Sequence, residues 1–201
     1  IQWDGAYRYR DDRWEVLVSP FLSYFGNYIF LEPSGEWSLL PHTGQLYRYR
    51  QSKAVTGGGE LEATFRFTDH WQLGGELEMV RNQNLSDRFA LPFSPPDMAT
   101  GELIYMDRGA GMLAQYRLRL EFRQIFDQRR VAKNEEPTPG ASLWNLSAHL
   151  QWRFGGQRVI TDLQVQNLFN TPYLNHLSFY RRLNIPEPGR NMQLIVRVPI
   201  G

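Results

Sequence analysis

The sequence predicts an all-β fold, an antiparallel up-and-down β-barrel, and three observations predict it. Apolar and polar residues alternate along most of the chain. The connections between these segments alternate strictly between short and long, and aromatic residues stand next to the short connections. Successive side chains of a strand point to opposite faces, so each segment has one apolar and one polar face.

The alternation defines nine expected strands. Residues Met112–Phe126 show it most clearly, because Leu118 and Leu120 fall on one face and Arg117 and Arg119 on the other. Within the third strand we expect Gly57-Gly58-Gly59 to mark a bend or β-bulge. In chain order the nine expected strands are Ile1–Arg10, Trp14–Phe30, Leu46–Phe67, Trp71–Arg81, Thr100–Asp107, Met112–Phe126, Leu143–Phe154, Arg158–Leu168 and Asn191–Ile200.

The joins between these strands fall into two classes. The expected tight turns are Asp11–Arg13, Thr68–His70, Arg108–Gly111 and Gly155–Gln157. The expected long loops are Leu31–Gln45, Asn82–Ala99, Asp127–Ser142 and Phe169–Arg190. Strict alternation places all tight turns at one end of the sheet and all long loops at the other, as in bacterial outer-membrane barrels.

Composition narrows the class of protein. The 201 residues carry a net charge of +1 and no cysteine, which argues against a nucleic-acid-binding surface, disulfides and thiolate metal sites. The mean hydropathy is −0.48 and no apolar run approaches the ~18 residues that suggest a transmembrane helix. Strands of a transmembrane barrel need only about 9–11 residues and are polar at every second position.

Aromatic placement bears on which face meets lipid. Trp14 and Trp71 follow tight turns, Trp152 and Phe154 precede one, and Tyr9 precedes another. This row fits an interfacial aromatic girdle with the apolar face outward. A soluble β-sandwich, in which the apolar face points inward, stays open as an alternative.

The C-terminal region carries motifs of a known family. The run Val165-Gln-Asn-Leu-Phe-Asn-Thr-Pro-Tyr173, the run Pro186-Glu-Pro-Gly-Arg-Asn191, and Tyr47-x-Tyr49-x-Gln51 leading to Gly59-x-Leu61-Glu62 resemble TonB-dependent outer-membrane receptors. Leu91-Pro92-Phe93-Ser94-Pro95-Pro96 and Glu136-Pro137-Thr138 are similar to the same family. One departure is the end, Val198-Pro199-Ile200-Gly201, where members of the family commonly have an aromatic residue.

The resemblance implies a barrel of 22 strands closed by an N-terminal plug. We expect residues 1–201 to be its C-terminal part, about nine strands, with the plug and the first strands cropped away before Ile1. The implied function is active import of a ferric siderophore, haem or related metal complex across the bacterial outer membrane. The implied partners are a TonB-type energy-transducing protein acting through the plug, the nutrient ligand, and outer-membrane lipid and lipopolysaccharide; no nucleic acid, cofactor or enzymatic activity is implied.

Candidate chemistry within the chain is limited. The four histidines lack metal-ligand spacing, so no metal site is expected, although His42 and His176 lie in long loops suited to substrate contact. Solvated charge on the interior face explains Glu60, Glu62, Glu76 and Glu78 better than acid–base catalysis, because no nucleophile accompanies them. No catalytic residue is therefore expected. The arginines Arg117, Arg119 and Arg123 are expected to line the barrel wall against the plug.

Substrate capture is expected on the long loops, through aromatic and basic side chains suited to an anionic chelate or an aromatic ligand. Packing between loops, or contact with lipopolysaccharide, explains these residues equally well. The candidates are Trp37, His42, Arg88, Phe89, Tyr180, Arg181 and Arg182. Three other functions stay open: a passive porin, a soluble carbohydrate-binding β-sandwich, and an outer-membrane enzyme barrel, which would need a nucleophile and base at its rim.

Overall fold

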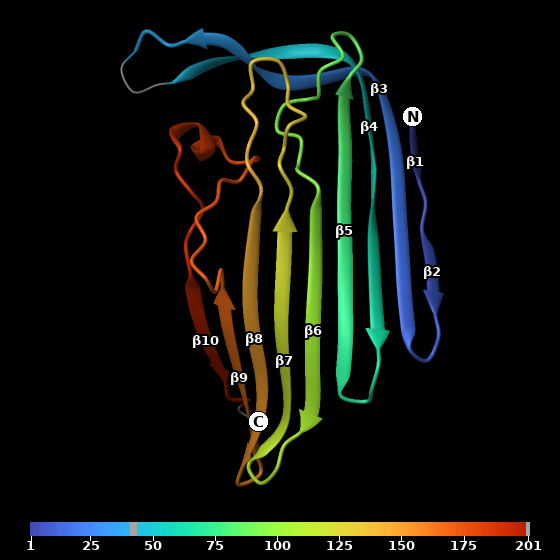
Figure 1. Cartoon of the computed structure of the whole chain (residues 1–201), viewed down its shortest axis with the longest axis vertical. Coiled ribbons are helices and arrows are strands. Elements are labelled where there is room, and N and C mark those ends of the chain that lie inside the picture. The colour runs from blue at the N-terminus through green and yellow to red at the C-terminus, as the bar shows by residue number, and fades with distance from the viewer. Residues whose placement is uncertain (41–43, 200–201) are drawn as a thin grey trace.

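The computed structural model describes residues 1–40 and 44–199, and within them one curved antiparallel sheet carries almost the whole chain (Figure 1). The order across the sheet is β1-β3-β4-β5-β6-β7-β8-β9-β10, and β2 also pairs with β3. The strands are β1 (Gln2–Asp4), β2 (Tyr7–Arg10), β3 (Trp14–Trp37), β4 (Gln45–Arg66), β5 (Trp71–Asn84), β6 (Met98–Arg108), β7 (Leu113–Ile125), β8 (Ala141–Phe154), β9 (Gln157–Gln166) and β10 (Asn191–Arg197). The all-β, antiparallel up-and-down prediction is confirmed.

The short and long connections lie at opposite ends of the sheet, as expected (Figure 1). The short connections after β2, β4, β6 and β8 form what we call the turn end. The connections 85–97, 126–140 and 167–190, together with the end of β3 and the start of β4, form the loop end. The connection 167–190 contains a short 3₁₀ helix, η1 (Phe179–Leu183). No helix in residues 1–40 and 44–199 is long and apolar enough to cross a membrane.

The prediction of a long loop over Leu31–Gln45 is wrong. Strand β3 continues to Trp37 and stays paired with β4, which begins at Gln45, so a two-stranded hairpin projects beyond the other strands and bends across the loop end (Figure 1). Ion pairs along the hairpin join Glu36 to Arg48 at 3.1 Å and Glu32 to Arg50 at 3.4 Å. These cross-strand pairs stabilise an extended ribbon in a stretch that lacks apolar alternation.

The glycine triplet does not form the expected bulge. Gly57, Gly58 and Gly59 pair in continuous register with β3 and β5. A Cβ atom on Gly58 would lie 2.1 Å from the carbonyl oxygen of Met79, so this glycine permits a close approach of β5. The register instead shifts between Phe25 and Tyr28 and between Pro33 and Trp37, where β3 bends toward the projecting hairpin.

Strand boundaries otherwise differ in detail. The expected strand Ile1–Arg10 is divided into β1 and β2, which both pair with β3. The Gly5 N–H still donates to the Pro20 carbonyl at 2.9 Å, so the interruption is local. A register shift between Leu113 and Gln115 also interrupts the β7–β8 pairing near the turn end.

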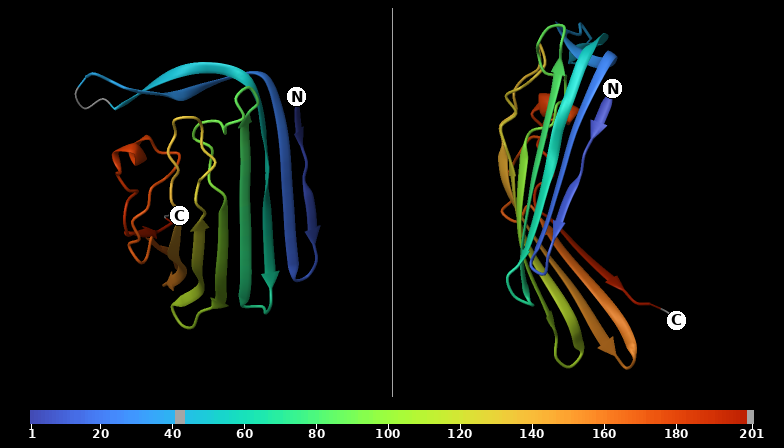
Figure 2. Two further views of the ribbon diagram at one scale, coloured as in Figure 1. Left: turned by 45° about the horizontal axis from the view of Figure 1, so that its top comes forward. Right: turned by 90° about the vertical axis from the view of Figure 1, so that its right-hand side faces the viewer.

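The sheet is a single layer with one apolar and one polar face, and Figure 2 shows how it curves and twists. Opposed residues of antiparallel strands share a face, and one transverse row is Phe65, Leu73, Leu103, Leu120 and Leu146. Leu118 is 41% exposed and Leu194 65% exposed. A sandwich would bury these side chains between two layers, so the single layer contradicts the soluble β-sandwich alternative.

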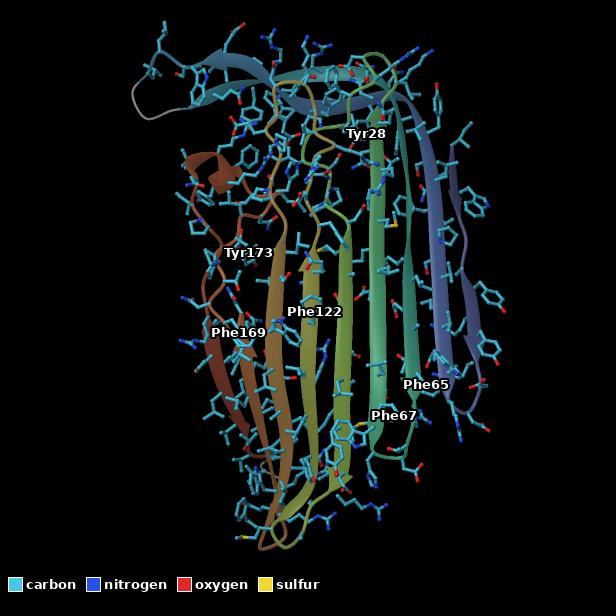
Figure 3. The ribbon with its side chains drawn as sticks, in the orientation of Figure 1. Tyr28, Phe65, Phe67, Phe122, Phe169 and Tyr173 are labelled. Carbon is cyan, nitrogen blue, oxygen red and sulfur yellow. The ribbon has the colours of Figure 1, made fainter. Side chains whose placement is uncertain are left out.

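An aromatic row follows the turn end on the apolar face. Trp14 stacks on Phe65 with ring centroids 4.4 Å apart, and Phe67 stacks on Trp71 at 6.2 Å. Trp71 in turn lies 4.7 Å from Tyr105. Figure 3 places Phe65 and Phe67 near the turn end and Tyr28 near the loop end.

Candidate ligand-binding site at the loop end

A cavity of about 550 Å³ opens between the β3–β4 hairpin and the connections 126–140 and 167–190. We call it the loop-end cavity. The residues around it are aromatic, basic or amide-bearing in large part: Gly35, Trp37, Gly44, Gln45, Tyr47, Asn134, Glu135, Glu136, Phe179, Arg181, Arg182 and Leu183. Three stretches far apart in sequence therefore build one site.

One wall of the loop-end cavity is aromatic. The ring centroid of Tyr47 lies 5.7 Å from that of Phe179 and 6.3 Å from that of Phe93. The Arg182 guanidinium lies over the Tyr47 ring, 4.5 Å from its centroid, and its Nη1 donates to Gln45 Oε1 at 2.6 Å. This cation–π contact stabilises the pair by about 0.5–2 kcal/mol and holds a positive charge at the cavity wall.

A buried ion pair fixes the loops that form the cavity. Arg181 Nη2 donates to Glu135 Oε1 at 2.6 Å, and the two side chains are 4% and 0% exposed. Glu135 also accepts the backbone N–H groups of Phe93 and Ala132, at 3.1 and 3.0 Å. One carboxylate thus joins the connections 85–97, 126–140 and 167–190, and each of its bonds compensates for the loss of water around the charge.

His176 also belongs to this hydrogen-bond network. Its Nδ1 shares a 2.8 Å hydrogen bond with Thr138 Oγ1, which also accepts Arg181 Nη1 at 3.1 Å. His176 Nε2 lies 3.5 Å from Glu135 Oε1. Burial, followed by the charge of Arg181, lowers the pKa of His176 to about 4. At neutral pH the imidazole is therefore neutral.

The polar groups of the cavity are suited to holding an anion or an aromatic ligand. Arg182 has no carboxylate partner within residues 1–40 and 44–199. The Nε–H of Arg181 is buried and without a hydrogen-bond partner in the same part of the chain. An unpaired buried donor costs free energy unless a ligand or water accepts from it. Across the described residues no group of three His, Cys, Asp or Glu side chains has the arrangement of a metal site.

Of the residues predicted to contact the substrate, the structure brings only some together. Trp37, Arg181 and Arg182 line the loop-end cavity, with Trp37 71% exposed and Arg181 buried. Arg88, Phe89 and Tyr180 lie outside its lining. His42 falls outside the described residues. Ligand contact by these residues stays a prediction.

Sequence reasoning did not name Tyr47 or Phe179 as a ligand contact, although Tyr47 belongs to one of the motifs that resemble the family. Tyr47 belongs to a strand with the alternation of a membrane span, so nothing local distinguishes it from a structural tyrosine. Phe179 stands beside the nominated Tyr180, and the N-cap Ser178, whose Oγ accepts from Tyr180 N at 3.2 Å, begins the short helix η1. The helix turns Phe179 toward Tyr47, and no residue pattern predicts that meeting.

The polar face of the sheet carries the expected charges in two arrangements. Arg119 forms ion pairs with Glu102 on the neighbouring strand β6 and with Glu121 on its own strand β7, the latter at 2.6 Å. By contrast, the carboxylates of β4 and β5 face each other, Glu60 opposite Glu78 and Glu62 opposite Glu76, without an ion pair among the described residues. Like charges in opposed positions destabilise the pairing, which requires solvation or a cationic surface facing them.

Comparison with known proteins agrees with this architecture. The family model described as "TonB dependent receptor-like, beta-barrel" matches residues 1–168. The copper transporter OprC is 24% identical with a TM-score of 0.78, over 97% of this chain and 30% of that one. BauA, the ferric preacinetobactin receptor from Acinetobacter baumannii, is 16% identical with a TM-score of 0.70, over 98% and 29%.

A third similar structure is the FrpB iron transporter from Neisseria meningitidis (F3-3 variant), 15% identical with a TM-score of 0.64, over 95% of this chain and 30% of that one. The present chain therefore spans about 30% of the length of these structures, whose likeness shows the fold. The family match covers most of the chain. With its alternating turn end and loop end and its two-faced single layer, this chain belongs to the TonB-dependent receptor-like β-barrel family.

Proposed function

We propose that this chain forms part of the wall and the ligand-capturing loops of an outer-membrane receptor that imports a scarce nutrient. The observation that supports it is the loop-end cavity, where the Arg182 guanidinium on Tyr47 and the rings of Phe179 and Trp37 line one space on a barrel of this family. Import draws energy from a TonB-type protein, which engages an N-terminal plug outside residues 1–201. The barrel wall binds and positions; no covalent chemistry is involved.

The same proposal fixes the orientation of the sheet in a bacterial outer membrane. The apolar face with exposed Leu118 and Leu194 meets lipid, and the polar face with Arg119 and Glu102 lines the interior. The aromatic row of the turn end then lies at the periplasmic interface and the loop end outside the cell. An open sheet edge is not tolerated in lipid, so strands outside this chain complete a barrel of about 22 strands.

The ligand we propose is an anionic metal chelate: a ferric siderophore, haem or related complex. The cavity offers the Arg182 guanidinium for negative charge and the rings of Tyr47, Phe179 and Trp37 for flat organic groups. Similar folds include a copper transporter, a ferric preacinetobactin receptor and an iron transporter. A metal-bearing nutrient is the class common to those three descriptions.

Binding to the full-length protein in detergent tests the site. Haemin and a panel of ferric tris-catecholate and citrate chelates serve as probes, with tryptophan fluorescence quenching as the readout. Loss of one charge-assisted contact costs about 1.5–3 kcal/mol, so Arg182→Gln is expected to weaken binding roughly 10- to 150-fold. Arg48→Gln is the matched control, since Arg48 lies beside Tyr47 in β4 but pairs with Glu36 outside the cavity lining. Equal affinities of the two variants for every bound probe would reject the loop-end cavity as the ligand-binding site.

Uptake by cells separates active import from a passive porin. Accumulation of the bound chelate is expected to stop when the TonB-type protein is deleted or the proton gradient is collapsed, while surface binding persists. A porin would give uptake that needs neither, and ion conductance through the purified protein. Uptake that is independent of both treatments would overturn the import proposal.

A further inference from the structure

Four arginines without a carboxylate partner lie on the polar face of β7, β8 and β9, and we call them the arginine row. Arg123 lies near the loop end of β7, and Arg117 lies nearer the turn end of the same strand. Arg153 stands opposite Arg158, next to the turn that joins β8 and β9. Within residues 1–40 and 44–199 no carboxylate pairs with any of the four. Like charges in opposed positions destabilise strand pairing, so the stability of the sheet does not explain Arg153 and Arg158.

A cavity of about 330 Å³ opens beside the middle of the arginine row, on the polar face of β7–β9. Its polar lining residues are Arg117, Arg119, Ser147, His149, Asp162 and Gln164. Arg119 is neutralised by carboxylates of β6 and β7, and Asp162 pairs with Arg197 and lies 2.6 Å from His149 Nδ1. Arg117 is exposed and has no counter-ion in the described part of the chain, so its guanidinium is free to bind an anion.

Arg123 connects the arginine row with the loop end. Its Nε–H is buried and has no hydrogen-bond partner among the described residues. Tyr173 of the connection 167–190 lies near it, since burial and the charge of Glu187 raise the pKa of Tyr173 and the charge of Arg123 opposes them. Figure 3 shows Tyr173 on the turn-end side of η1, and the same connection carries Arg182 at the loop-end cavity. The arginine row therefore begins beneath the connection that lines the loop-end cavity.

The polar face of β4 and β5 carries the opposite charge. Four carboxylates there have no ion pair among the described residues: Glu60, Glu62, Glu76 and Glu78. An anion at the polar face is therefore repelled by β4–β5 and attracted by β7–β9. The rise of about 3.3 Å per residue separates Arg123 from Arg117 by about 20 Å along β7. It separates His149, which stands opposite Arg117, from Arg153 by about 13 Å along β8.

From this arrangement we infer that the arginine row guides an anionic nutrient chelate along the interior wall, from the loop-end cavity to the turn end. The inference rests on the proposed import function and adds the wall and the residues that the chelate contacts after capture. Guanidinium groups bind carboxylate and catecholate oxygens through charge-assisted hydrogen bonds. Rows of arginine select anions in membrane pores, and passage requires several sites that each bind weakly enough to release the ion. Separate, exposed arginines such as Arg117, Arg153 and Arg158 meet that requirement.

Uptake by cells that carry the full-length protein tests the arginine row, with radiolabelled ferric tris-catecholate, ferric citrate or haemin, whichever the wild type binds. Arg117→Gln is expected to lower the maximal uptake rate about fivefold, because it removes one solvated charge at contact distance. The Kd of surface binding is expected to stay unchanged, since Arg117 lies outside the loop-end cavity. Arg117→Lys keeps the charge and is expected to transport like wild type.

Arg66→Gln is the matched control. Arg66 is an exposed arginine on the polar face at the turn end of β4, without a carboxylate partner in residues 1–40 and 44–199 and away from the arginine row. Its maximal uptake rate is expected to equal that of wild type. Equal rates in Arg117→Gln and Arg66→Gln would overturn the inference, and so would a loss that Arg117→Lys does not restore.

Hydrogen exchange of the N-terminal plug separates a ligand path from a surface that only holds the plug. Arg117→Gln is expected to leave the protection of the plug unchanged. Protection that falls together with the uptake rate would assign the arginine row to plug docking and overturn the inference. A failure of the import proposal is distinguishable, because it appears in the wild type as a bound chelate that is not taken up, whereas a failure of the arginine row appears only in the variants.

Discussion

Glu135 is the residue on which the loop end depends most. Its carboxylate is fully buried and bonds to Arg181 and to the backbone N–H groups of Phe93 and Ala132. Removing one partner of a buried ion pair leaves the other charge unpaired, which costs about 3–5 kcal/mol. Glu135→Ala is therefore expected to release the connection 167–190, seen as loss of hydrogen-exchange protection by a factor of 100 or more (about 1.4 kcal/mol per factor of ten).

The neighbouring exposed carboxylate provides the control for that prediction. Glu136 lies one residue further along and its backbone oxygen accepts from Arg181 Nη1, so Glu136→Ala removes a surface charge without breaking the network. It is expected to change protection less than threefold, since surface substitutions have effects within about 0.5 kcal/mol. Equal protection in the two variants would show that the ion pair does not hold the loops.

His176 makes the loop end sensitive to acid. Its pKa is lowered to about 4 in the folded state from 6.5 when exposed, so the folded loop requires the neutral imidazole. Between these two values the unfolded loop binds a proton and the folded loop does not, so stability is complete above pH 6.5 and falls as the pH falls toward 4. The difference corresponds to roughly 3 kcal/mol. Hydrogen exchange of residues 167–190 is expected to accelerate between pH 7 and pH 5.

Replacing the imidazole separates this titration from the protonation of carboxylates. His176→Asn is expected to abolish most of the change between pH 7 and pH 5 because no side chain then titrates at that position. His70→Gln, at the turn end, is expected to retain it. An acid response that is identical in His176→Asn and wild type would contradict the role given to His176.

At the scale of elements, the glycine triplet sets how closely β4 and β5 approach. A Cβ atom on Gly58 would lie 2.1 Å from the Met79 carbonyl oxygen, whereas one on Gly101 in β6 would meet nothing within 4 Å. Overpacking against backbone typically costs about 1–3 kcal/mol. Gly58→Ala is expected to lower the temperature of heat-modifiable unfolding and Gly101→Ala to leave it unchanged. A Gly58→Ala protein as stable as Gly101→Ala would disprove the close approach.

Most strands were predictable because membrane-type strands carry a period of two and end at short polar turns. The β3–β4 hairpin was not, since residues beyond Phe30 include Pro33, Ser34 and Gly35 and have polar side chains on both faces. Ion pairs such as Glu36–Arg48 keep that ribbon paired, and such pairs depend on register that the local pattern does not encode. The prediction of a bulge at the glycines was wrong for a related reason. Glycine also occurs in strands where a neighbouring backbone approaches closely, and the local sequence does not distinguish the two cases.

The candidate site was predictable in its location and partly in its residues. Aromatic and basic composition nominated Trp37, Arg181 and Arg182, which the structure brings to one cavity. Tyr47 and Phe179 were not predicted as ligand contacts, because their meeting depends on the Glu135–Arg181 pair between distant loops. Side-chain type indicates which groups suit a ligand, and only long-range packing decides which of them meet.

At the scale of the whole molecule, one layer carries two incompatible surfaces. The apolar face exposes Leu73 and Leu77 of β5 and Leu120 of β7, and the polar face carries the ion pairs of Arg119. An apolar surface this extensive is stable in water only when covered. Lipid covers it in the proposed orientation, which also places the loop-end cavity outside the cell.

Spin labels on adjacent residues test this orientation most directly. Nitroxides placed at Leu118 and Leu194 and, on the opposite face, at Arg117 and Gln193 report collisions with oxygen and with a water-soluble nickel chelate in the full-length protein in bilayers. High oxygen and low nickel accessibility at Leu118 and Leu194, with the reverse at Arg117 and Gln193, is the result expected. Nickel accessibility at Leu118 and Leu194 equal to that at Arg117 and Gln193 would contradict a lipid-facing apolar surface.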